Sequence, residues 1–179
     1  ATQPDACVST PGTSNMDRYG CLDTDGDGYS DPDGGWSILD GADVWPGNPE
    51  QWADADQDGY GDNYLYDINQ SSQLHINQRG DAFPMDPQQW NDTDGDGYGD
   101  NYDNPAWTAN RAPHWPGERL PGATMPDAFP LDRTQWSDAD GDGIGDNPNS
   151  GTSDGCPNVV GDSFWDRLGC PDSCLLYTS

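Results

Sequence analysis

The segment DAFPMDPQQWNDTDGDGYGDN, residues 81–101, occurs three times in this chain with small variations. The other copies are DVWPGNPEQWADADQDGYGDN at 43–63 and DAFPLDRTQWSDADGDGIGDN at 127–147, so the aspartate, aromatic, proline, tryptophan and glycine positions coincide. Self-similarity at fixed offsets is typical of repeat architectures. The connecting segments 64–80 and 102–126 differ in length and composition, as surface loops do. The sequence therefore predicts a tandem array of blocks.

A second, longer repeat links the two ends of the chain. CVSTPGTSNMDRYGCLDT at residues 7–24 resembles CPNVVGDSFWDRLGCPDS at 156–173, and both copies contain GxSxxDRxGC with equally spaced cysteines. We predict one disulfide in each copy, because each pair closes a short loop within its own module; free thiols are the alternative. A loop of about 15 residues gains roughly 3 kcal/mol in the chain-entropy model. The predicted pairs are Cys7–Cys21 and Cys156–Cys170.

The last six residues, CLLYTS, break this register, which predicts aspartate at position 174. One reading frame of a transposon-derived sequencing adapter encodes the same string, so we interpret 174–179 as adapter read-through; a natural terminus with an extra thiol is the alternative. The predicted divisions are a disulfide module with the first acidic loop at 1–42, repeats with their connectors at 43–80 and 81–126, a third repeat at 127–155, and the start of another disulfide module at 156–173.

The composition excludes several classes of protein. The 179 residues carry 33 acidic side chains and six arginines, a formal charge of -27, and only 31% are hydrophobic. Such a chain is ordinarily disordered. Eight tryptophans and eight tyrosines, with aspartates at fixed offsets from glycine, instead indicate an ordered chain whose charge is neutralised by metal. Nucleic acid would be repelled, and no apolar run has the ~20 residues of a membrane span.

Four segments share the pattern DxDxDGxxD, and their positions 1, 3, 5 and 9 are all aspartate. Calcium prefers six to eight hard oxygen ligands, and glycine at position 6 permits the sharp turn that such a loop needs. Position 7 offers a main-chain carbonyl. The predicted ligands are Asp23, Asp25, Asp27, Tyr29 and Asp31; Asp54, Asp56, Asp58, Tyr60 and Asp62; Asp92, Asp94, Asp96, Tyr98 and Asp100; and Asp138, Asp140, Asp142, Ile144 and Asp146.

The near absence of thiolate and imidazole from these loops argues against zinc and copper. Magnesium is the weaker alternative because it prefers an octahedral site that keeps several waters. A solvated acidic linker is the other alternative, but it does not explain why position 6 is always glycine and position 9 always aspartate. Calcium is therefore the predicted ion.

Each block also has an aspartate upstream of its loop, at Asp43, Asp81 and Asp127. These residues could close an adjacent calcium site, or they could simply form a turn before the aromatic residue. Further along each block, Asn48, Asp86 and Asp132 resemble helix N-caps. The glutamine three residues later completes a capping box, with ligation as the alternative. The glutamines are Gln51, Gln89 and Gln135.

The aromatic residues of the blocks have two possible roles. Met85 with Trp90, and Leu131 with Trp136, would form hydrophobic staples beside the predicted caps. We expect the block aromatics to form small cores, because a metal loop alone buries little apolar surface. A carbohydrate-stacking platform is the alternative. These aromatics are Trp45, Trp52, Phe83, Trp90, Phe129 and Trp136.

The loops differ from an EF-hand, because position 12 lacks the bidentate glutamate and holds Gly34, Leu65, Asp103 and Asn149. Their strings DADQDGYGD, DTDGDGYGD and DADGDGIGD instead resemble thrombospondin type 3 repeats and related acidic arrays of bacterial and archaeal surface proteins. That resemblance implies loop aspartates as calcium ligands in a chain with little regular secondary structure. The family's cysteine after the loop is missing, so its disulfide framework is not carried over.

The expected fold is a mostly irregular, calcium-stapled tandem repeat array with short helical turns, few short β pairs and assisting disulfides. We expect an extracellular or cell-surface structural protein, a stiff rod, fibril, stalk or adhesin shaft, that self-associates or contacts neighbouring repeats. A calcium-dependent glycan- or protein-binding module is the alternative. His75 and His114 stand alone without a nucleophile, so no enzyme is expected. Sequons at Asn69 and Asn91 permit glycans.

Overall fold

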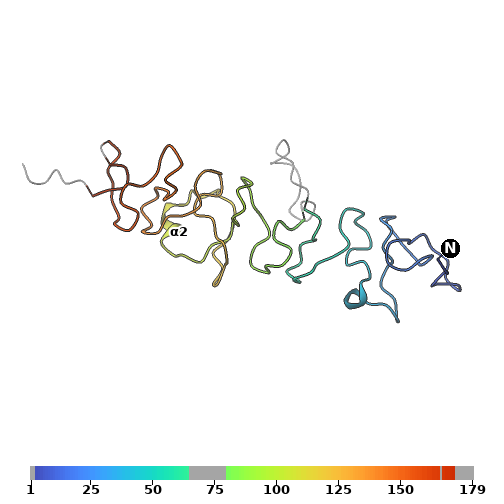
Figure 1. The fold of residues 1–179 in the computed structure, drawn as a ribbon. Coiled ribbons are helices and arrows are strands. Elements are labelled where there is room, and N and C mark those ends of the chain that lie inside the picture. Colours follow the sequence, from blue (N-terminus) through green and yellow to red (C-terminus); the bar gives the residue numbers. More distant parts are fainter. Residues whose placement is uncertain (1–2, 65–79, 166, 172–179) are drawn as a thin grey trace, which may run out of the picture. The chain divides into compact units, whose positions relative to one another are not determined.

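The computed structural model describes residues 3–64, 80–165 and 167–171. Asn69, His75, Leu65 and the segment 174–179 lie outside the described residues. The chain divides into two compact units, Ala1–Pro87 and Gln88–Ser179, and in both units the ribbon is drawn almost entirely as loop (Figure 1).

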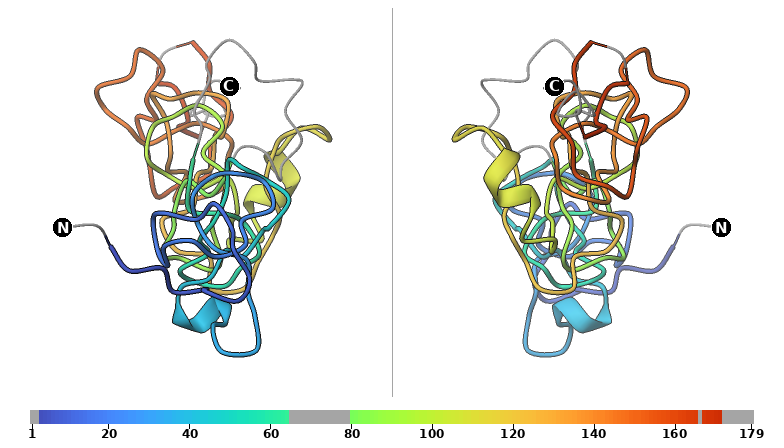
Figure 2. Two further views of the ribbon diagram at one scale, coloured as in Figure 1. Left: turned by 90° about the vertical axis from the view of Figure 1, so that its right-hand side faces the viewer. Right: turned by 90° about the vertical axis from the view of Figure 1, so that its left-hand side faces the viewer.

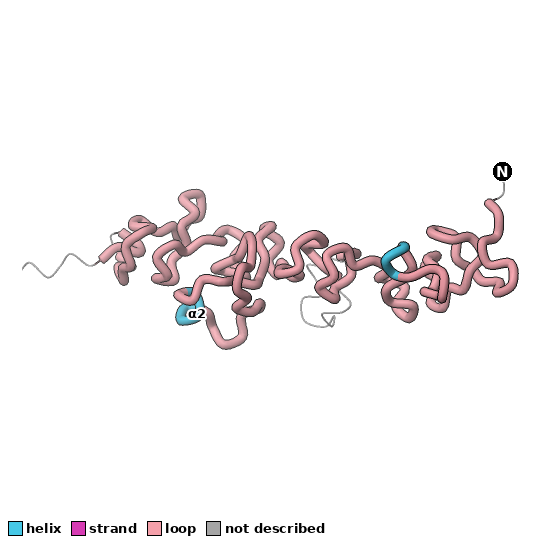
Figure 3. The backbone as a smooth tube through the Cα atoms, turned by 90° about the horizontal axis from the view of Figure 1, so that it is seen from below, coloured by secondary structure: helices cyan, strands magenta, loops and turns pink. Residues whose placement is uncertain are grey.

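Regular secondary structure is scarce in the described part of the chain (Figure 3). It comprises a 3-10 helix, η1 (Ile38–Asp40), in the first unit and an α-helix, α2 (Trp107–Asn110), in the second. Figure 2 shows both as short coils, η1 in light blue and α2 in yellow. The isolated bridges are Asp33↔Trp36, Gly99↔Pro126 and Tyr102↔Arg119. The predicted irregular fold is confirmed.

The helix η1 is short because both of its ends are fixed by side chains and by glycine. The Asp40 carboxylate accepts hydrogen bonds from the Ser37 amide at 3.0 Å and from its hydroxyl at 2.7 Å. Gly41 has φ 105°, a left-handed conformation that favours glycine, and its N–H donates to the Ile38 carbonyl. The carboxylate at the start and the glycine at the end therefore limit this element to a single turn.

Both predicted disulfides are present. Cys7 pairs with Cys21 in the first unit, and Cys156 pairs with Cys170 in the second, with Cα separations of 5.0 and 5.1 Å. The two modules also fold alike, because Ala6 N–H donates to the Tyr19 carbonyl just as Gly155 N–H donates to the Leu168 carbonyl. The similarity of the two cysteine modules in sequence therefore extends to their backbone pairing.

The predicted helix caps are wrong. Gln51 N–H donates to the Asn48 carbonyl at 3.0 Å and Gln135 N–H to the Asp132 carbonyl at 2.8 Å, but each makes a single turn that no helix follows. The chain after Asp86 also continues without a helix. The glutamine side chains do not reach back to the cap, because they bind backbone further along the chain. Met85 and Leu131 are exposed, so the predicted staples do not form.

The interior of the described residues is mainly polar. The one apolar cluster, in the second unit, consists of Tyr102, Trp107 and Ala128, with Phe129 packed against it. The largest fully buried side chains are instead amides and carboxylates, including those of Gln51, Gln89 and Asn101. Burying such groups is unfavourable unless they are hydrogen-bonded or bind an ion. The blocks therefore depend mainly on polar contacts, while the block aromatics are half-buried and one of them, Phe129, packs against the apolar cluster.

Aromatic side chains link successive blocks. Tyr29, at position 7 of an acidic loop, stacks on Trp52 of the next block with ring centroids 5.2 Å apart. Tyr98 stacks on Trp136 in the same way at 5.1 Å. Offset stacks of this kind contribute about 0.5–1.5 kcal/mol beyond area burial. The tryptophan thus packs against the preceding loop.

Candidate metal centres

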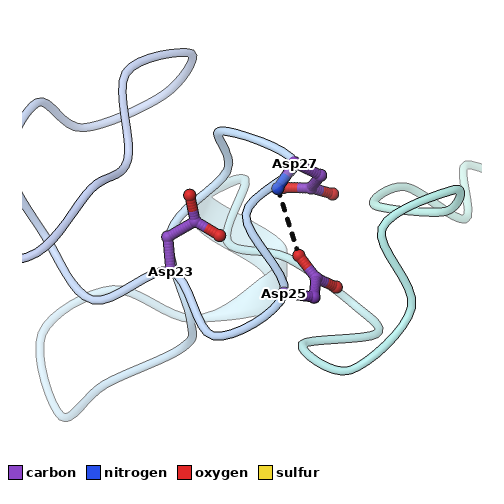
Figure 4. A group of neighbouring side chains, drawn as sticks. All are labelled: Asp23, Asp25 and Asp27. Carbon is purple, nitrogen blue, oxygen red and sulfur yellow. Dashed lines mark hydrogen bonds between the residues drawn. The ribbon is translucent and has the colours of Figure 1, made fainter.

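Among the described residues, four groups of three carboxylates could each hold a metal ion. We call the surrounding segments loop 1 (Asp23–Asp31), loop 2 (Asp54–Asp62), loop 3 (Asp92–Asp100) and loop 4 (Asp138–Asp146). Each group consists of positions 1, 3 and 5, with one oxygen from each residue lying within 4.8 Å of the others. Figure 4 shows Asp23, Asp25 and Asp27 of loop 1 converging in this way. All donors are carboxylate oxygens, which suit a hard cation.

The carboxylate at position 1 accepts hydrogen bonds from backbone amides later in the same loop. In loop 1, Asp23 accepts hydrogen bonds from the amides of Gly26 at 2.7 Å and Gly28 at 3.2 Å. Asp138 does the same in loop 4, with Gly141 at 2.8 Å and Gly143 at 3.0 Å. The glycine at position 6 has φ between 88° and 102° in all four loops, as expected of a residue that permits the sharp turn.

Position 4 distinguishes loop 2 from the others. Gly26, Gly95 and Gly141 occupy it in loops 1, 3 and 4, with φ between 77° and 85°. Loop 2 has Gln57 there, with φ 66°, in the same left-handed region. A side chain in this conformation is strained by roughly 1–2 kcal/mol. Loop 2 therefore keeps the common backbone at a higher conformational energy.

Six of the eight aspartates at positions 3 and 5 direct one oxygen at the loop backbone and keep the other buried, whereas Asp142 accepts from the Gly161 amide as well. Asp25 accepts from the Asp27 amide at 3.2 Å (Figure 4), and Asp27 accepts from the Tyr29 amide at 2.8 Å. The remaining oxygens are buried and have no hydrogen-bond partner. This holds for Asp25, Asp27, Asp56, Asp58, Asp96 and Asp140. Buried carboxylate oxygens without donors are costly, and a bound cation would satisfy them.

The aspartates at position 9 lie outside the groups of three. Asp31 accepts from the Thr24 amide at 3.0 Å and its hydroxyl at 2.5 Å, and Asp100 accepts likewise from Thr93. Asp62 and Asp146 accept from the amides of Ala55 and Ala139. In each loop the position 9 N–H also donates to the carbonyl just before position 1. Position 9 therefore closes the loop backbone, and its direct ligation stays a prediction, as does that of the position 7 carbonyls.

The three upstream aspartates lie beside the loop that precedes them in the chain. Asp43 N–H donates to the carbonyl of Ser30, which is position 8 of loop 1, at 2.9 Å. Asp81 pairs with Gly61 of loop 2 at 2.6 Å, and Asp127 with Gly99 of loop 3 at 2.8 Å. In each case the side-chain Oδ1 accepts from the amide two residues ahead, at 2.7 Å. This geometry confirms the turn and also places a carboxylate beside the adjacent loop.

Sequence reasoning missed a fourth residue of this kind, Asp154. Its N–H donates to the carbonyl of Gly145, position 8 of loop 4, at 2.8 Å, and its Oδ1 accepts from the Cys156 amide at 2.6 Å. It is followed by a disulfide module and not by an aromatic residue, so it does not match the block pattern. The longer repeat was the available signal, since Asp5 precedes Cys7 in the same way and accepts from the Cys7 amide. We call Asp43, Asp81, Asp127 and Asp154 the docking aspartates.

The block glutamines hold the end of each loop in what we call the glutamine clamp. Gln89 Oε1 accepts from the Asn101 amide at 3.0 Å, and Gln89 Nε2 donates to the Asn101 carbonyl at 2.8 Å. Gln51 makes both contacts with Asn63, and Gln135 accepts from the Asn147 amide. The asparagine side chains return a bond to the carbonyl before the glutamine. The recurrence of Gln and Asn at fixed positions was the signal for this contact.

Loop 1 follows a cysteine module and is held by different residues. Asp17 accepts from the Ser30 amide at 2.9 Å and hydroxyl at 2.5 Å. Arg18 donates to the Ser30 hydroxyl and to the Asp31 carbonyl, and its guanidinium lies over the Trp36 ring. Loop 3 has a similar cation, because Arg111 donates to the Asp100 carbonyl and stacks over Tyr102. Guanidinium groups thus fix the carbonyl at position 9 in these two loops.

The crowded carboxylates have raised pKa values. Burial, and then the neighbouring aspartates of the preceding loop, raise the pKa of Asp43 to about 6, that of Asp81 to about 7 and that of Asp127 to about 8. Burial, and then the other aspartates of its own loop, raise the pKa of Asp58 to about 6. Without a cation, these sites therefore favour a partly protonated state.

No family model matches the chain, and no curated protein and no solved structure is significantly similar to it. In the described part of the chain, no helix has the length and apolar character needed to cross a membrane. The chain is thus a disulfide-containing protein of irregular fold with several acidic clusters that could bind metal.

Proposed function

We propose that this chain is a calcium-binding structural protein, built from tandem repeats that are similar to thrombospondin type 3 repeats. The observation that carries the proposal is the set of buried carboxylate oxygens without a hydrogen-bond partner on six loop aspartates, Asp25, Asp27, Asp56, Asp58, Asp96 and Asp140. A cation at each loop would neutralise these groups. It would also add folding stability that the small apolar cluster is not large enough to provide. Calcium suits oxygen-only loops of this flexibility better than magnesium does.

The mechanical role follows from the position of the sites. Each block contains a loop, so ions bound along the chain would fix every block in turn. A chain fixed in this way serves as a stiff, protease-resistant element of a fibril, stalk or adhesin shaft. Two disulfides are compatible with an extracellular or cell-surface location, where calcium is also abundant. We propose no enzymatic activity, because acid catalysis needs a carboxyl in an apolar pocket and these loops are polar.

The experiment compares the metal-free protein with the calcium-loaded protein. Isothermal titration calorimetry should show calcium binding with several ions per chain, and calcium should change the circular dichroism spectrum and slow proteolysis. Magnesium at equal concentration should act more weakly. Asp27→Asn should weaken binding at loop 1, whereas the exposed Asp162→Asn should not. Unchanged spectra and no binding heat would exclude the proposal.

A second candidate function is a calcium-dependent binding module. It is favoured by exposed apolar residues in the last cysteine module, where Phe164 is 70% and Trp165 is 99% exposed. Exposed aromatic side chains are enriched at binding surfaces. Glycan-array binding or concentration-dependent self-association that Trp165→Ser abolishes would support this function, and a monomer that binds no glycan would argue against it.

A further inference from the structure

The acidic loops do not supply enough ligands for calcium from their own residues. Calcium takes six to eight oxygens, but only positions 1, 3 and 5 converge in each loop. Position 9 hydrogen-bonds to position 2 in each loop, and Asp146 of loop 4 also keeps a buried Oδ1 without a hydrogen-bond partner. At position 12, Asp103 is the one carboxylate in the described loops, and it is exposed and accepts from the Gly122 amide. A carboxylate from outside the loop would help to complete the coordination shell.

The docking aspartates are buried carboxylates whose backbone pairs with position 8 of the preceding loop. Asp43, Asp81, Asp127 and Asp154 are 1%, 0%, 1% and 8% exposed, so each is more than nine-tenths buried. Their Oδ1 atoms are used by the amide two residues ahead, but every Oδ2 atom is buried without a hydrogen-bond partner. A buried charge without a partner is strongly unfavourable. The same orphaned atom in four copies indicates a common ligand.

The charges around each docking aspartate indicate that a cation bound by its Oδ2 would lie at the preceding loop. The carboxylates that act most strongly on Asp127 are Asp96, Asp94 and Asp100, which are positions 5, 3 and 9 of loop 3. The other three copies face positions 5, 3 and 9 of loops 1, 2 and 4 in the same order. Like charges packed together repel one another, and a cation bound between them would relieve that repulsion.

We propose that Asp43, Asp81, Asp127 and Asp154 each supply a calcium ligand that closes the site of the preceding loop, at the place where an EF-hand uses position 12. The proposal rests on the proposed function, because it presumes that the loops bind calcium. It adds Asp154 as a ligand of loop 4. Under this proposal each ion is bound by a loop and also by the docking aspartate of the segment that follows the connector. Calcium binding would therefore stabilise the contact between that segment and the loop.

This arrangement explains how the connectors can differ. The interval from position 9 to the docking aspartate is shortest at Asp146–Asp154 and longest at Asp100–Asp127, yet the backbone pairing is the same in both. A ligand held by position 8 does not depend on the length of the chain between. The pairing at position 8 and the ion, and not the length of the connector, therefore determine how each docking aspartate lies against its loop.

The test uses the whole chain and the variants Asp127→Asn and Asp154→Asn, with Asp162→Asn as the matched control. Asparagine keeps the oxygen that accepts from the Phe129 or Cys156 amide but removes the charge. Calcium titration by calorimetry should show one site weakened by about tenfold or more in each variant, since even outer-shell partners of a metal contribute that much. Terbium-induced NMR line broadening should identify loop 3 or loop 4 as the affected site.

The outcomes separate this inference from the proposed function. If the wild-type chain binds calcium and the two variants bind like Asp162→Asn, the docking aspartates are not ligands and the inference is wrong, while the function stands. If the wild-type chain binds no calcium, both are wrong. A purely structural role would lower the stability of the metal-free variants. Ligation predicts that the metal-free variants are at least as stable as the wild type, because each lacks an unpaired buried charge.

Discussion

Gln89 binds both backbone groups of Asn101, accepting from its amide at 3.0 Å and donating to its carbonyl at 2.8 Å. The same Nε2 also donates to the Thr124 carbonyl at 2.7 Å, so a single buried side chain connects a block, its loop end and the connector. This contact is the clearest example of the polar interior of the second unit.

Gln89→Glu should destabilise the calcium-loaded protein by about 2–4 kcal/mol, because two buried carbonyls lose their donor and a charge is buried without a partner. Urea unfolding monitored by tryptophan fluorescence measures this loss. The same substitution at the exposed Gln3 is the control and should be neutral. Equal stability of the two variants would show that the clamp contributes little.

Gly99→Ala should also destabilise the second unit. A Cβ at Gly99 would overlap Oε1 of Gln89, so either the clamp or the loop must shift. Overpacking of this kind costs about 1–3 kcal/mol. Gly34→Ala is the matched control, since nothing lies near its Cβ and its φ is ordinary. A thermal midpoint that falls only in the Gly99 variant is the expected result.

Gln57→Gly should stabilise loop 2. The left-handed backbone at Gln57 is unstrained for glycine, although the unfolded chain gains entropy, so the expected net gain is about 0.5–1 kcal/mol. The reciprocal change Gly95→Gln should destabilise loop 3. Chemical denaturation of both variants tests the pair, and a loss of stability in Gln57→Gly would contradict the interpretation.

The metal-free protein should lose stability as the pH rises. The folded pKa values of Asp81, about 7, and of Asp127, about 8, lie above the ordinary value of 3.8. The folded state therefore binds more protons than the unfolded state between these values, and stability falls as the pH increases from 3.8 toward 8. Asp127→Asn should flatten this slope in thermal unfolding experiments, and Asp162→Asn should not.

Calcium should reverse this dependence, because the ion displaces protons from its carboxylate ligands. In the calcium-loaded protein the ligand carboxylates should stay ionised below the ordinary pKa of 3.8, so stability should rise as the pH increases through about 4 and stay level above about 5. Thermal midpoints with calcium and with a chelator should therefore diverge as the pH increases. Parallel curves would show that the buried carboxylates do not exchange protons for the ion.

Features that depend on local spacing were predictable from the sequence. The turns of loops 1–4 and the pairs Cys7–Cys21 and Cys156–Cys170 follow from residues close together in the chain. The docking partner of each docking aspartate was not predictable, because the two lie across connectors of unequal length, and Asp154 was recognisable only through the longer repeat. The predicted capping box was wrong because the glutamine side chain can turn either back to the cap or forward to backbone later in the chain. Gln51 turns toward the Asn63 backbone, which is available only after the loop has folded.

The amides and carboxylates that fill this interior affect how the protein responds to temperature. Heat-capacity change on unfolding grows with the apolar surface that becomes hydrated and is reduced by polar surface. With so few apolar side chains buried, this chain should have a small heat-capacity increment and a flat stability curve. Unfolding of the metal-free chain should then give a coil that does not aggregate, and returning the ions should restore the fold without a chaperone.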